Sequence, residues 1–581
     1  MHDLIIKGGT VIDGSGSEPI TADVAIDNGL ITEVGKISAK AKQVYDADGA
    51  IVSPGFVDIH THYDAQATWD PHLTPSCWHG VTTAVCGNCG VGFAPAAPDR
   101  HEWLIELMEG VEDIPGSALS EGIIWNWETF PEYLDALDNT PLAVDLGTQI
   151  SHGALRGYVM GERGARNESA TAEDVERMAA LVKEAIQAGA LGFSSSRTRG
   201  HRALDGEPVP GSFAAEDELW GIGRAMQDIG QGVFELSPAG TGGDTAMDGA
   251  DEILEEMDWM CRLAVEIDRP VSFTMLQYDS RPNRWRECLE MAANTAKKGG
   301  LVYPQIAGRP FGMLAGHQTI VNPYKGKPSY DALEHLPVEE KAALLKNPEL
   351  EKKILEEAVA EGEYNFFADP AIFENIYPLG DPPNYEPSPD DSLAAIARAK
   401  GIPVEELAWE TLMGDEGREL LLFPFMNYSD RSCDPHREMI LNPQAILGLG
   451  DGGAHCGLIC DASLPTFMLS HWARDRSRGE TLPLEFIIKR MTTDTAKVYG
   501  LNDRGLLAPG YKADVNVFDA SRVQLRRPEM VFDLPAGARR LIQRSDGYLA
   551  TMVSGETVMD NGHRTDARPG KLIRGAQAAP R

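Results

Sequence analysis

The sequence Ile59-His60-Thr61-His62 lies directly after the apolar run of residues 50–57. In a β-strand, residues two apart point to the same side, so His60 and His62 share one side of the strand end. Two imidazoles placed in this way hold one divalent metal ion from a rigid base; two unrelated surface histidines are the alternative. A metal site at the carboxyl end of a strand is typical of a barrel, so the chain should contain seven more strands and further ligands.

The composition predicts a globular protein with a large core. The chain has 581 residues, of which 43% are hydrophobic and 24% are charged, and this length exceeds one ordinary domain. The 88 acidic and 52 basic residues give a formal charge of −36. Nucleic acids and anionic membranes bind basic surfaces, so this charge argues against both as partners.

The sequence also bears on the location of the protein. The first residues lack the basic, apolar and small-residue regions of a signal peptide. No uninterrupted apolar run is long enough to span a bilayer. The eight cysteines in so long a chain are expected to be reduced thiols. Together these features predict a cytoplasmic protein.

Both ends of the chain are rich in short strands separated by turns. Near the amino terminus, Asn28-Gly29 between alternating strands is a strong hairpin signal. Similar strands return at residues 513–518 and 548–555, before Asn561-Gly562. We therefore expect residues 1–54 and 491–565, the second part beginning with the last helix, to form one small β-sandwich domain.

The long middle of the chain alternates apolar runs with amphipathic stretches. The candidate strands are residues 51–58, 81–85, 142–150, 190–194, 232–236, 270–275, 300–306 and 445–450. Helical patterns lie between them, for example at 172–188, 214–229, 250–267 and 284–298. Eight strands alternating with helices predict a (β/α)8 TIM barrel over residues 55–490, with functional residues at the carboxyl ends of the strands. A flavodoxin-like open sheet is the alternative, but it does not explain eight units.

The connection between the seventh and eighth strands is much longer than usual. It takes about 140 residues, whereas most connections are short. Residues 338–362 are charged and helical in pattern, and residues 370–390 are rich in Pro and Asp. We interpret residues 310–425 as an insertion that is able to cover the barrel mouth. Residues 566–581 are expected to form a loosely attached tail.

Cys86-Gly87-Asn88-Cys89 follows the second strand. A Cys-x-x-Cys sequence is redox-active in thioredoxin-like folds or forms half of a zinc ribbon. The chain has no second Cys-x-x-Cys, and its strand pattern is not thioredoxin-like. We therefore expect the Cys89 thiolate beside the metal; a small cysteine buried in a tight glycine turn is the alternative.

The eighth strand ends in a glycine-rich sequence that contains Asp451. Such an aspartate is commonly a turn residue. At the end of a barrel strand opposite His60 and His62, however, it can bind the metal and take a proton from the attacking water. The fourth strand ends in Ser194-Ser195-Ser196-Arg197, so a carbamylated lysine between two metals has no donor there.

Three residues are candidates for substrate binding. His152 follows the third strand and either orients substrate or is a structural histidine bonded to backbone. On and after the seventh strand, Tyr303 and Arg309 are expected near the barrel mouth, where an arginine can bind a substrate carboxylate. A surface ion pair is the alternative for Arg309. The sequence does not place the remaining candidate histidines, His201, His317, His455 and His471.

These motifs together resemble the amidohydrolase superfamily and, more closely, the N-acyl-D-amino-acid deacylase (D-aminoacylase) family. The matching motifs run nearly from end to end of the chain. They are residues 5–14 (IIKGGTVIDG), 54–62 (PGFVDIHTH), 80–90 (GVTTAVCGNCG), 152–156 (HGALR), 189–195 (GALGFSS), 450–452 (GDG), 495–501 (TAKVYGL), 504–505 (RG) and 509–514 (PGYKAD). The combination is specific for the family and less so for its substrate.

The resemblance implies a barrel with a split β-sandwich, a zinc site and hydrolysis of an N-acyl amide. By position, His60 and His62 match the family's strand-one pair. Cys89 matches its zinc cysteine and Asp451 its catalytic aspartate. Relatives carry a histidine at each of strands five and six as further zinc ligands, and this chain has none there. Glu235 on strand five either replaces one of them as an oxygen ligand or has a core or supporting role.

We therefore expect a metal-dependent amidohydrolase that cleaves a C–N amide bond of a small molecule with metal-activated water. The expected substrate is an N-acyl (D-)amino acid or a similar N-acyl compound. The expected cofactor is Zn²⁺, one ion rather than two, with another divalent metal as the alternative. Two other functions stay open: hydrolysis of a cyclic amide, carbamate or ester-like bond, and a metal-poor relative that binds or assembles without catalysis. Homo-oligomer formation also stays open.

Overall fold

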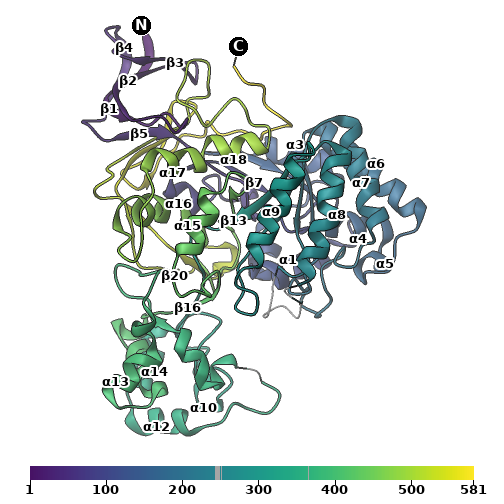
Figure 1. Cartoon of the computed structure of the whole chain (residues 1–581). Helices are drawn as coiled ribbons and strands as arrows, with labels where there is room; N and C mark the ends of the chain where they lie inside the picture. The colour runs from purple at the N-terminus through teal and green to yellow at the C-terminus, as the bar shows by residue number, and fades with distance from the viewer. Residues whose placement is uncertain (242–248, 250, 364, 581) are drawn as a thin grey trace.

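A barrel of parallel strands lies at the centre of the chain (Figure 1). The computed structural model describes residues 1–241, 249, 251–363 and 365–580, and within these the barrel has eight strand positions. Their bounds are β6 (Phe56–Asp58), β7 (Val81–Cys86), β8 (Asp145–Thr148) continued by β9 (Ile150–Ser151), β10 (Gly192–Ser196), β11 (Val233–Ser237), β12 (Val271–Thr274), β13 (Val302–Ile306) and β17 (Ile446–Leu447). A parallel bridge between Thr61 and Gly452 joins the last strand to the first. The predicted barrel fold is confirmed.

The barrel strands are buried on both faces, which explains why they stand out in the sequence. Every residue of β7, β10 and β11 is buried, and strands of this kind form near-continuous apolar runs. The helices around them are amphipathic. In α6 (Ala172–Ala188), Met178, Val182, Ala185 and Ile186 are buried at helical spacing and face the strands.

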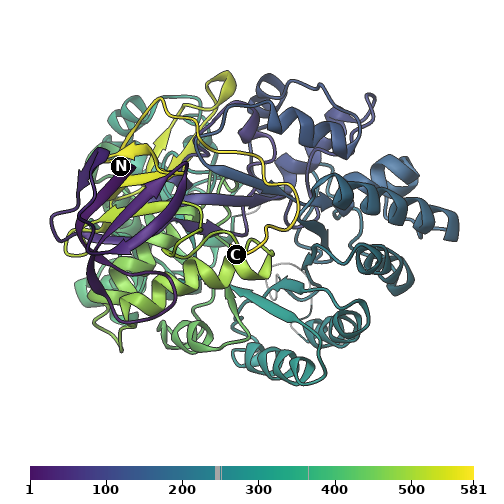
Figure 2. The same ribbon diagram turned by 90° about the horizontal axis from the view of Figure 1, so that it is seen from above.

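Helices cover the outside of the barrel (Figures 1 and 2). They are α1 (His101–Glu112), α2 (Gly116–Gly122), α3 (Phe130–Asp138), α4 (His152–Met160), α5 (Glu162–Ala165), α6, α7 (Glu216–Ile229), α8 (Glu252–Ile267), α9 (Arg284–Ala296), α15 (Asp434–Leu441), α16 (Leu464–Phe467), α17 (Leu484–Met491) and α18 (Thr493–Val498), with a π-helix at Met468–Asp475. Ala250, the first residue of one predicted helix, lies outside the described residues. None of the described helices is long and apolar enough to cross a membrane.

The predicted first strand, residues 51–58, is divided between two sheets. Residues 51–54 form β5 (Ile51–Pro54) in the sheet of the chain ends, and β6 begins the barrel after Gly55. A Cβ at Gly55 would lie 2.1 Å from Thr82 Oγ1. The chain can therefore pass this close to β7 and change sheets only with a glycine at this position.

Strands from both chain ends form one nine-stranded sheet (Figure 2). Its order is β25-β24-β23-β18-β5-β1-β2-β3, with β4 paired to β1. The bounds are β1 (His2–Val11), β2 (Ile20–Asp27), β3 (Leu30–Gly35), β4 (Ala41–Asp46), β18 (Val515–Phe518), β23 (Tyr548–Val553), β24 (Glu556–Asp560) and β25 (His563–Arg564). Asn28 and Gly29 have φ angles of 51° and 77°, the left-handed values that a two-residue hairpin turn requires. The predicted hairpin is confirmed.

A helical lobe is inserted between the seventh and eighth barrel strands (Figure 1). It begins with β14 (Phe311–Ala315) and ends with β16 (Leu421–Met426), which pair antiparallel; we call residues 311–426 the insertion lobe. Its other elements are β15 (Tyr377–Pro378), α10 (Pro328–Asp331), α11 (Val338–Leu345), α12 (Pro348–Glu356), α13 (Leu393–Lys400) and α14 (Val404–Leu412). The lobe has a hydrophobic cluster of its own, which includes Tyr324, Phe367 and Trp409.

Two short antiparallel pairs lie between the barrel and the strands at the carboxyl end. They are β19 (Gln524–Leu525) with β22 (Ser545–Asp546), and β20 (Glu529–Val531) with β21 (Arg540–Ile542). Figure 1 shows β20 beside the insertion lobe.

The carboxyl-terminal segment is packed against the barrel, so the prediction of a loosely attached tail is wrong for residues 570–573. The amides of Gly570 and Ile573 donate to the carbonyls of Leu142 and Leu146 at 2.9 and 2.7 Å. Ile573 is buried. Residues 572 and 573 are apolar and pack beside β8. The free energy gained by their burial there outweighs the conformational entropy that the chain loses. Arg581 lies outside the described residues.

We expect Ile573→Ala to lower the free energy of unfolding by about 2–5 kcal/mol, because it removes a buried side chain and leaves a cavity. Urea unfolding measures this change. The matched control is Lys571→Ala, whose side chain is exposed, and its expected change is within about 0.5 kcal/mol. Equal stability of wild type and Ile573→Ala would contradict the packing of the tail.

Candidate metal centre

Two backbone hydrogen bonds bring the first and last barrel strands together at the barrel mouth. The amide of Asp451 donates to the carbonyl of His60 at 3.0 Å, and the amide of His62 donates to that of Gly452 at 2.8 Å. A Cβ at Gly450 would lie 2.6 Å from Asp58 Oδ2, so a side chain there would have to displace that carboxylate. The contact places the Asp451 carboxylate against both imidazoles.

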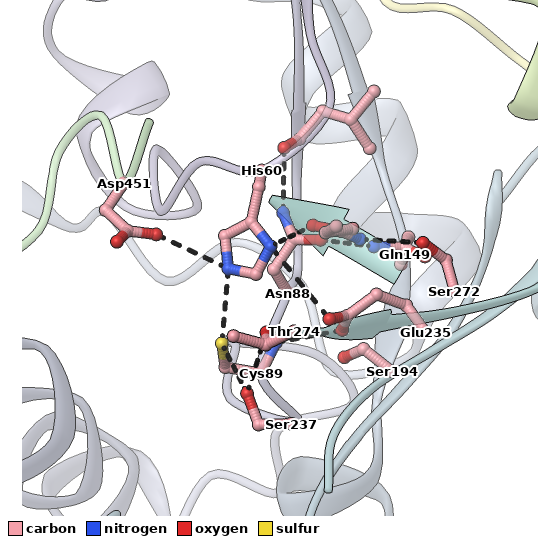
Figure 3. Close-up of polar contacts among 12 residues, drawn as sticks. His60, Asn88, Cys89, Gln149, Ser194, Glu235, Ser237, Ser272, Thr274 and Asp451 are labelled. Carbon is pink, nitrogen blue, oxygen red and sulfur yellow. Dashed lines mark hydrogen bonds and ion pairs between the residues drawn. The ribbon is translucent and has the colours of Figure 1, made fainter. Parts of the chain in front are cut away.

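Ligand atoms of four residues lie close together at this point. His60 Nε2 lies 3.2 Å from Cys89 Sγ and 3.4 Å from Asp451 Oδ1 (Figure 3). His62 Nε2 lies 3.6 Å from the same Oδ1, and the ligand atoms of His60, His62 and Cys89 all lie within 4.8 Å of one another. Ligand atoms at about 2.0–2.3 Å from a tetrahedral zinc ion are about 3.3–3.8 Å apart. The three shorter distances are close to that spacing, so the donor set suits a zinc ion.

The turn that carries Cys89 is held from the barrel interior. The side-chain amide of Asn88 donates to the carbonyls of Thr61 and Val85 at 3.1 and 2.9 Å. Cys89 has a φ angle of 54°, a conformation that L-residues rarely adopt and that the surrounding structure must hold in place. A Cβ at Gly87 would lie 2.3 Å from a backbone oxygen, so only glycine allows this tight turn.

A hydrogen-bond chain orients His60. Gln305 Nε2 donates to Ser272 Oγ at 3.0 Å, which turns its Oε1 toward His60 Nδ1 at 2.7 Å. Nδ1 therefore carries the proton, and Nε2 presents its lone pair to the cluster. Burial lowers the pKa of His60 to about 4, so the ring is neutral near pH 7, as a metal ligand must be.

Glu112, the last residue of α1, faces the other imidazole. Its Oε1 lies 3.5 Å from His62 Nδ1, and its Oε2 lies 3.8 Å from His455 Nε2. Glu112 is 2% exposed. Burial disfavours the imidazolium, but Glu112 and Asp451 outweigh it and raise the pKa of His62 to about 9. A buried carboxylate at Nδ1 is the usual partner of a metal-binding histidine.

Burial disfavours the charged forms of the acidic groups in the cluster. It raises the pKa of the Cys89 thiol well above its usual range, and nearby carboxylates raise it further. For Asp451, burial acts against ionisation, yet His62, His60 and His455 hold the pKa of its carboxyl well below the usual value. A divalent cation would stabilise both the thiolate and the carboxylate.

Glu235 lies beside this cluster but does not join the converging atoms. Its Oε2 accepts a hydrogen bond from the amide of Cys89 at 3.1 Å, and its Oε1 is 4.0 Å from His60 Nδ1, the nitrogen that points away from the cluster (Figure 3). The contacts favour the supporting role over the predicted ligand role. The strand-five side chain that contacts the Cys89 thiol is Ser237, with its Oγ 3.3 Å from Sγ.

His152 lies in a closed hydrogen-bond network. Its Nδ1 contacts Ser195 Oγ and its Nε2 contacts Glu218 Oε1, both at 2.9 Å. Arg156 donates to the same carboxylate, with Nη1 2.6 Å from Oε2. His152 is fully buried and both of its nitrogens are used, so the contacts favour the structural alternative over substrate binding.

Tyr303 is not at the barrel mouth, where we expected it. It lies near the start of β13, and its side chain packs against a cluster of apolar residues that includes Ile446 and Ile573. Strand direction explains the difference, because only the carboxyl end of β13 reaches the site.

Arg309 follows the carboxyl end of β13. It is 1% exposed and donates to Asp461 Oδ1 at 2.9 Å, so its ion pair is buried and not at the surface. Asp461 lines one cavity with Asp451. Contact of Arg309 with substrate stays a prediction.

The four unplaced histidines lie in three regions. His455 contacts Glu112 at the site, and His201, whose pKa is lowered by burial, lies within electrostatic reach of the same carboxylate. His317 belongs to the insertion lobe. His471 Nε2 donates to the carboxylate of Glu386 at 2.9 Å, close to Cys433.

The group of Glu386, Cys433 and His471 also has metal-ligating side chains within one small region. Arg476, however, donates to both oxygens of Glu386, at 3.0 and 3.1 Å. The amide of Cys433 donates to the same carboxylate at 2.8 Å. These contacts describe a buried ion-pair cluster with its acceptors already in use.

Sequence reasoning missed three residues of the site: Glu112, Gln305 and Ser237. Glu112 ends an ordinary amphipathic helix and carries no local signal. Gln305 and Ser237 stand near the carboxyl ends of predicted strands, so their position alone could have named them as candidates.

Convergence of histidine, cysteine and carboxylate ligand atoms at the mouth of a (β/α)8 barrel defines the metal-dependent barrel hydrolases. The chain belongs to the amidohydrolase family, because the sequence profile of that family matches residues 43–559. It is accordingly a hydrolase of carbon–nitrogen bonds other than peptide bonds.

Two enzymes are similar to the chain over nearly its whole length. The D-aminoacylase of Alcaligenes xylosoxydans xylosoxydans is 27% identical over 587 residues, which cover 98% of this chain and 97% of that enzyme. The N-acyl-D-aspartate deacylase of the same organism is 27% identical over 599 residues, which cover 100% of this chain and 96% of that enzyme. The predicted resemblance is confirmed.

Solved structures support the same fold. One is a D-aminoacylase described by its binuclear metal centre, with one-metal activation and second-metal attenuation. Its structure has a TM-score of 0.65 at 23% identity, and the match covers 99% of this chain and 100% of the D-aminoacylase chain. The N-acyl-D-glutamate deacylase from Bordetella bronchiseptica, complexed with zinc and a phosphonate inhibitor, has a TM-score of 0.64 at 23% identity, with 99% of both chains covered.

We expect Glu112→Gln to weaken zinc binding about ten- to a hundredfold. The neutral amide of glutamine no longer favours a proton on His62 Nδ1, which leaves Nε2 free to bind the metal in the wild type. Competition with a chromophoric chelator measures the affinity independently of activity. The matched control is Glu106→Gln, on the same helix with an exposed side chain. Equal zinc affinity in Glu112→Gln and wild type would show that Glu112 does not support His62.

The network around Glu218 predicts a pH-dependent stability. Burial opposes ionisation of Glu218, but His152 and Arg156 outweigh it and lower its pKa from 4.5 to about 2. The ionised carboxylate therefore stabilises the fold fully above pH 4.5, and this contribution is lost as the pH falls toward 2.

At pH 7, Glu218→Gln should cost about 3–5 kcal/mol, because it breaks a buried ion pair. In urea unfolding, the gap to wild type should narrow between pH 5 and pH 3. Glu216→Gln, at a half-exposed surface pair, serves as control and should cost no more than about 1 kcal/mol. A gap that stays constant with pH would contradict the role of the Glu218 charge.

Proposed function

We propose that the chain removes the acyl group from an N-acyl (D-)amino acid or a similar N-acyl compound. The observation that carries the proposal is the convergence of Nε2 of His60, Nε2 of His62 and Oδ1 of Asp451 at one point of the barrel mouth. The two relatives of nearly full length, which act on N-acyl-D-amino acids by name, support this substrate class. Water adds across the amide, the C–N bond breaks, and a carboxylic acid and an amine leave.

The residues of the cluster have separate roles in this proposal. His60, His62 and Asp451 would hold the metal ion, with Cys89 as a further ligand. A bound divalent ion lowers the pKa of water and polarises the amide carbonyl. Asp451 takes the proton of the attacking water and passes it to the leaving nitrogen. Gln305 keeps Nε2 of His60 unprotonated, so that this nitrogen is available as a ligand.

One zinc ion rather than two fits the residues at strands five and six. The β11 side chain that contacts the Cys89 thiol is Ser237, and neither β11 nor β12 contains a histidine. A neutral serine hydroxyl is a poor zinc ligand beside nitrogen and sulfur donors. The D-aminoacylase described with one-metal activation supports a functional site with a single ion.

The same proposal places the enzyme in the cytoplasm. All eight cysteines are free thiols, and reduced thiols are the rule in that compartment. The net charge of −36 supports a small-molecule substrate in preference to a nucleic acid.

Asp451→Asn should reduce turnover of an N-acyl-D-amino acid at least about a thousandfold, because the amide cannot take up the proton. Zinc content, measured by elemental analysis of the same sample, should stay close to one ion per chain if His60, His62 and Cys89 retain it. Asp566→Asn, an exposed aspartate near the carboxyl end, is the control. Turnover near the wild-type rate in Asp451→Asn would rule out this residue as the proton carrier.

A panel of N-acyl-D- and N-acyl-L-amino acids, tested on protein purified without chelator, separates the proposal from its alternatives. Hydrolysis of the D-compounds supports it. Trace metal with no activity after zinc addition would indicate a non-catalytic relative. Activity only toward cyclic amides or carbamates would support metal-dependent hydrolysis but indicate a different class of substrate.

A further inference from the structure

A cleft of about 910 Å³ lies between the insertion lobe and the β20–β21 pair. Lobe residues in the ranges 317–341 and 415–420 form one wall, and residues 527–541 form the other. Figure 1 shows β20 at the junction of the insertion lobe and the barrel. His60, His62, Cys89 and Asp451 do not line the cleft, so it is a separate cavity.

Five lysine and arginine side chains line this cleft, although the chain as a whole carries a net charge of −36. Three of them, Lys325, Arg418 and Arg527, form ion pairs with carboxylates of the insertion lobe. Among the residues that the structure describes, Lys341 and Arg539 have no carboxylate at ion-pair distance. The cleft is also lined by Glu334, Glu339, Asp415 and Glu529, but each of these carboxylates forms an ion pair with another cation. Lys341 and Arg539 are therefore the two cations of the cleft that stand outside these ion pairs, and they favour an anionic ligand.

Lys341 is the more buried of the two cations. Its side chain is part of a residue that is 5% exposed. Nζ donates to the carbonyl of His317 at 3.1 Å and lies 5.3 Å from the centre of the Tyr330 ring. An ammonium group has three donors, and these contacts provide one hydrogen-bond acceptor. Burial of such a group is costly unless an anion accompanies it.

His317 supplies a second unused donor at the cleft. Asn322 Oδ1 accepts from the amide of Tyr324 at 2.8 Å, which fixes the orientation of the side-chain amide. Its Nδ2 therefore points to His317 Nδ1, at 3.4 Å, and the Tyr330 hydroxyl lies 2.8 Å from the same nitrogen. Nδ1 is thus an acceptor and Nε2 carries the proton. Nε2 is buried and has no partner among the described residues, and His317 is 4% exposed.

The other residues that line the cleft are partly polar and partly apolar. One apolar side chain among them, Phe532, is 64% exposed. The apolar residues are Leu336, Pro337, Val338, Leu420, Pro528, Met530, Phe532 and Leu541. A ligand that satisfies the cleft therefore needs an anionic end with oxygen acceptors and an apolar remainder.

We propose that this cleft binds a carboxylate with an apolar chain, whose oxygens accept from Lys341, Arg539 and His317 Nε2. The chain of the ligand lies against Phe532 and its apolar neighbours. The site is independent of the proposed deacylation, because none of the converging metal ligands takes part in it. Inorganic phosphate shares the charge of this ligand but not the apolar chain.

The test is isothermal titration calorimetry of octanoate into the zinc-loaded full-length protein. We expect saturable binding that weakens about ten- to a hundredfold in Arg539→Gln, because a charged hydrogen-bond donor is lost. Lys341→Met should have a similar effect. The control Arg224→Gln removes one positive charge from α7, on the outside of the barrel, and should bind octanoate as wild type does.

Two further measurements assign the binding to the cleft. Carboxylates also bind metal ions, so binding at the cleft must persist in the double variant His60→Ala/His62→Ala, which lacks two of the proposed metal ligands, and must be weakened in Arg539→Gln. Phe532→Ala should weaken octanoate binding and leave any phosphate binding unchanged. Arg539 is partly exposed, so its variant decides the outcome even if the buried Lys341→Met fails to fold.

Three results would overturn the proposal. They are absence of saturable octanoate binding to wild type, equal affinity in Arg539→Gln and wild type, and tighter binding of phosphate than of octanoate. The first two would show that the cations do not form a site. The third would show that the apolar residues of the cleft do not select the ligand.

Discussion

The backbone contact between residues 60–62 and 451–452 is the constraint on which the rest of the site depends. Its two hydrogen bonds close the ring of strands and set Asp451 against His60 and His62. The contact that closes the barrel therefore also brings the ligand atoms together. Glycine at position 450 favours this close approach, because a side chain there would have to displace the Asp58 carboxylate.

Burial then determines the electrostatics of the site. Away from water, a thiol, two imidazoles and a carboxylate cannot all take the protonation states that metal binding requires without a compensating cation. Neighbouring side chains with fixed positions set the orientation and protonation of these groups. Gln305 sets the tautomer of His60, and Glu112 faces Nδ1 of His62. Rigid supports of this kind keep the ligand atoms at zinc-compatible spacing before any ion binds.

Much of this could be predicted from the sequence, and the failures have physical causes. The barrel strands were recognisable because strands buried on both faces form apolar runs, and Asn28-Gly29 marked a hairpin through its left-handed backbone. Tyr303 was misplaced because it stands near the start of its strand, whereas only the carboxyl end reaches the barrel mouth. The partner of Arg309 could not be predicted, because Asp461 is 152 positions away.

The sequence by itself determined the fold class and the chemical types of the ligands. Both are recorded locally, in the period-two placement of His60 and His62 and in the apolar strand that precedes them. Only the tertiary structure decided which residues support those ligands. Gln305 meets His60 across 245 positions, and Ser237 stands against Cys89 from another strand. Such pairings follow from how the closed barrel packs as a whole, and no short stretch of sequence carries that information.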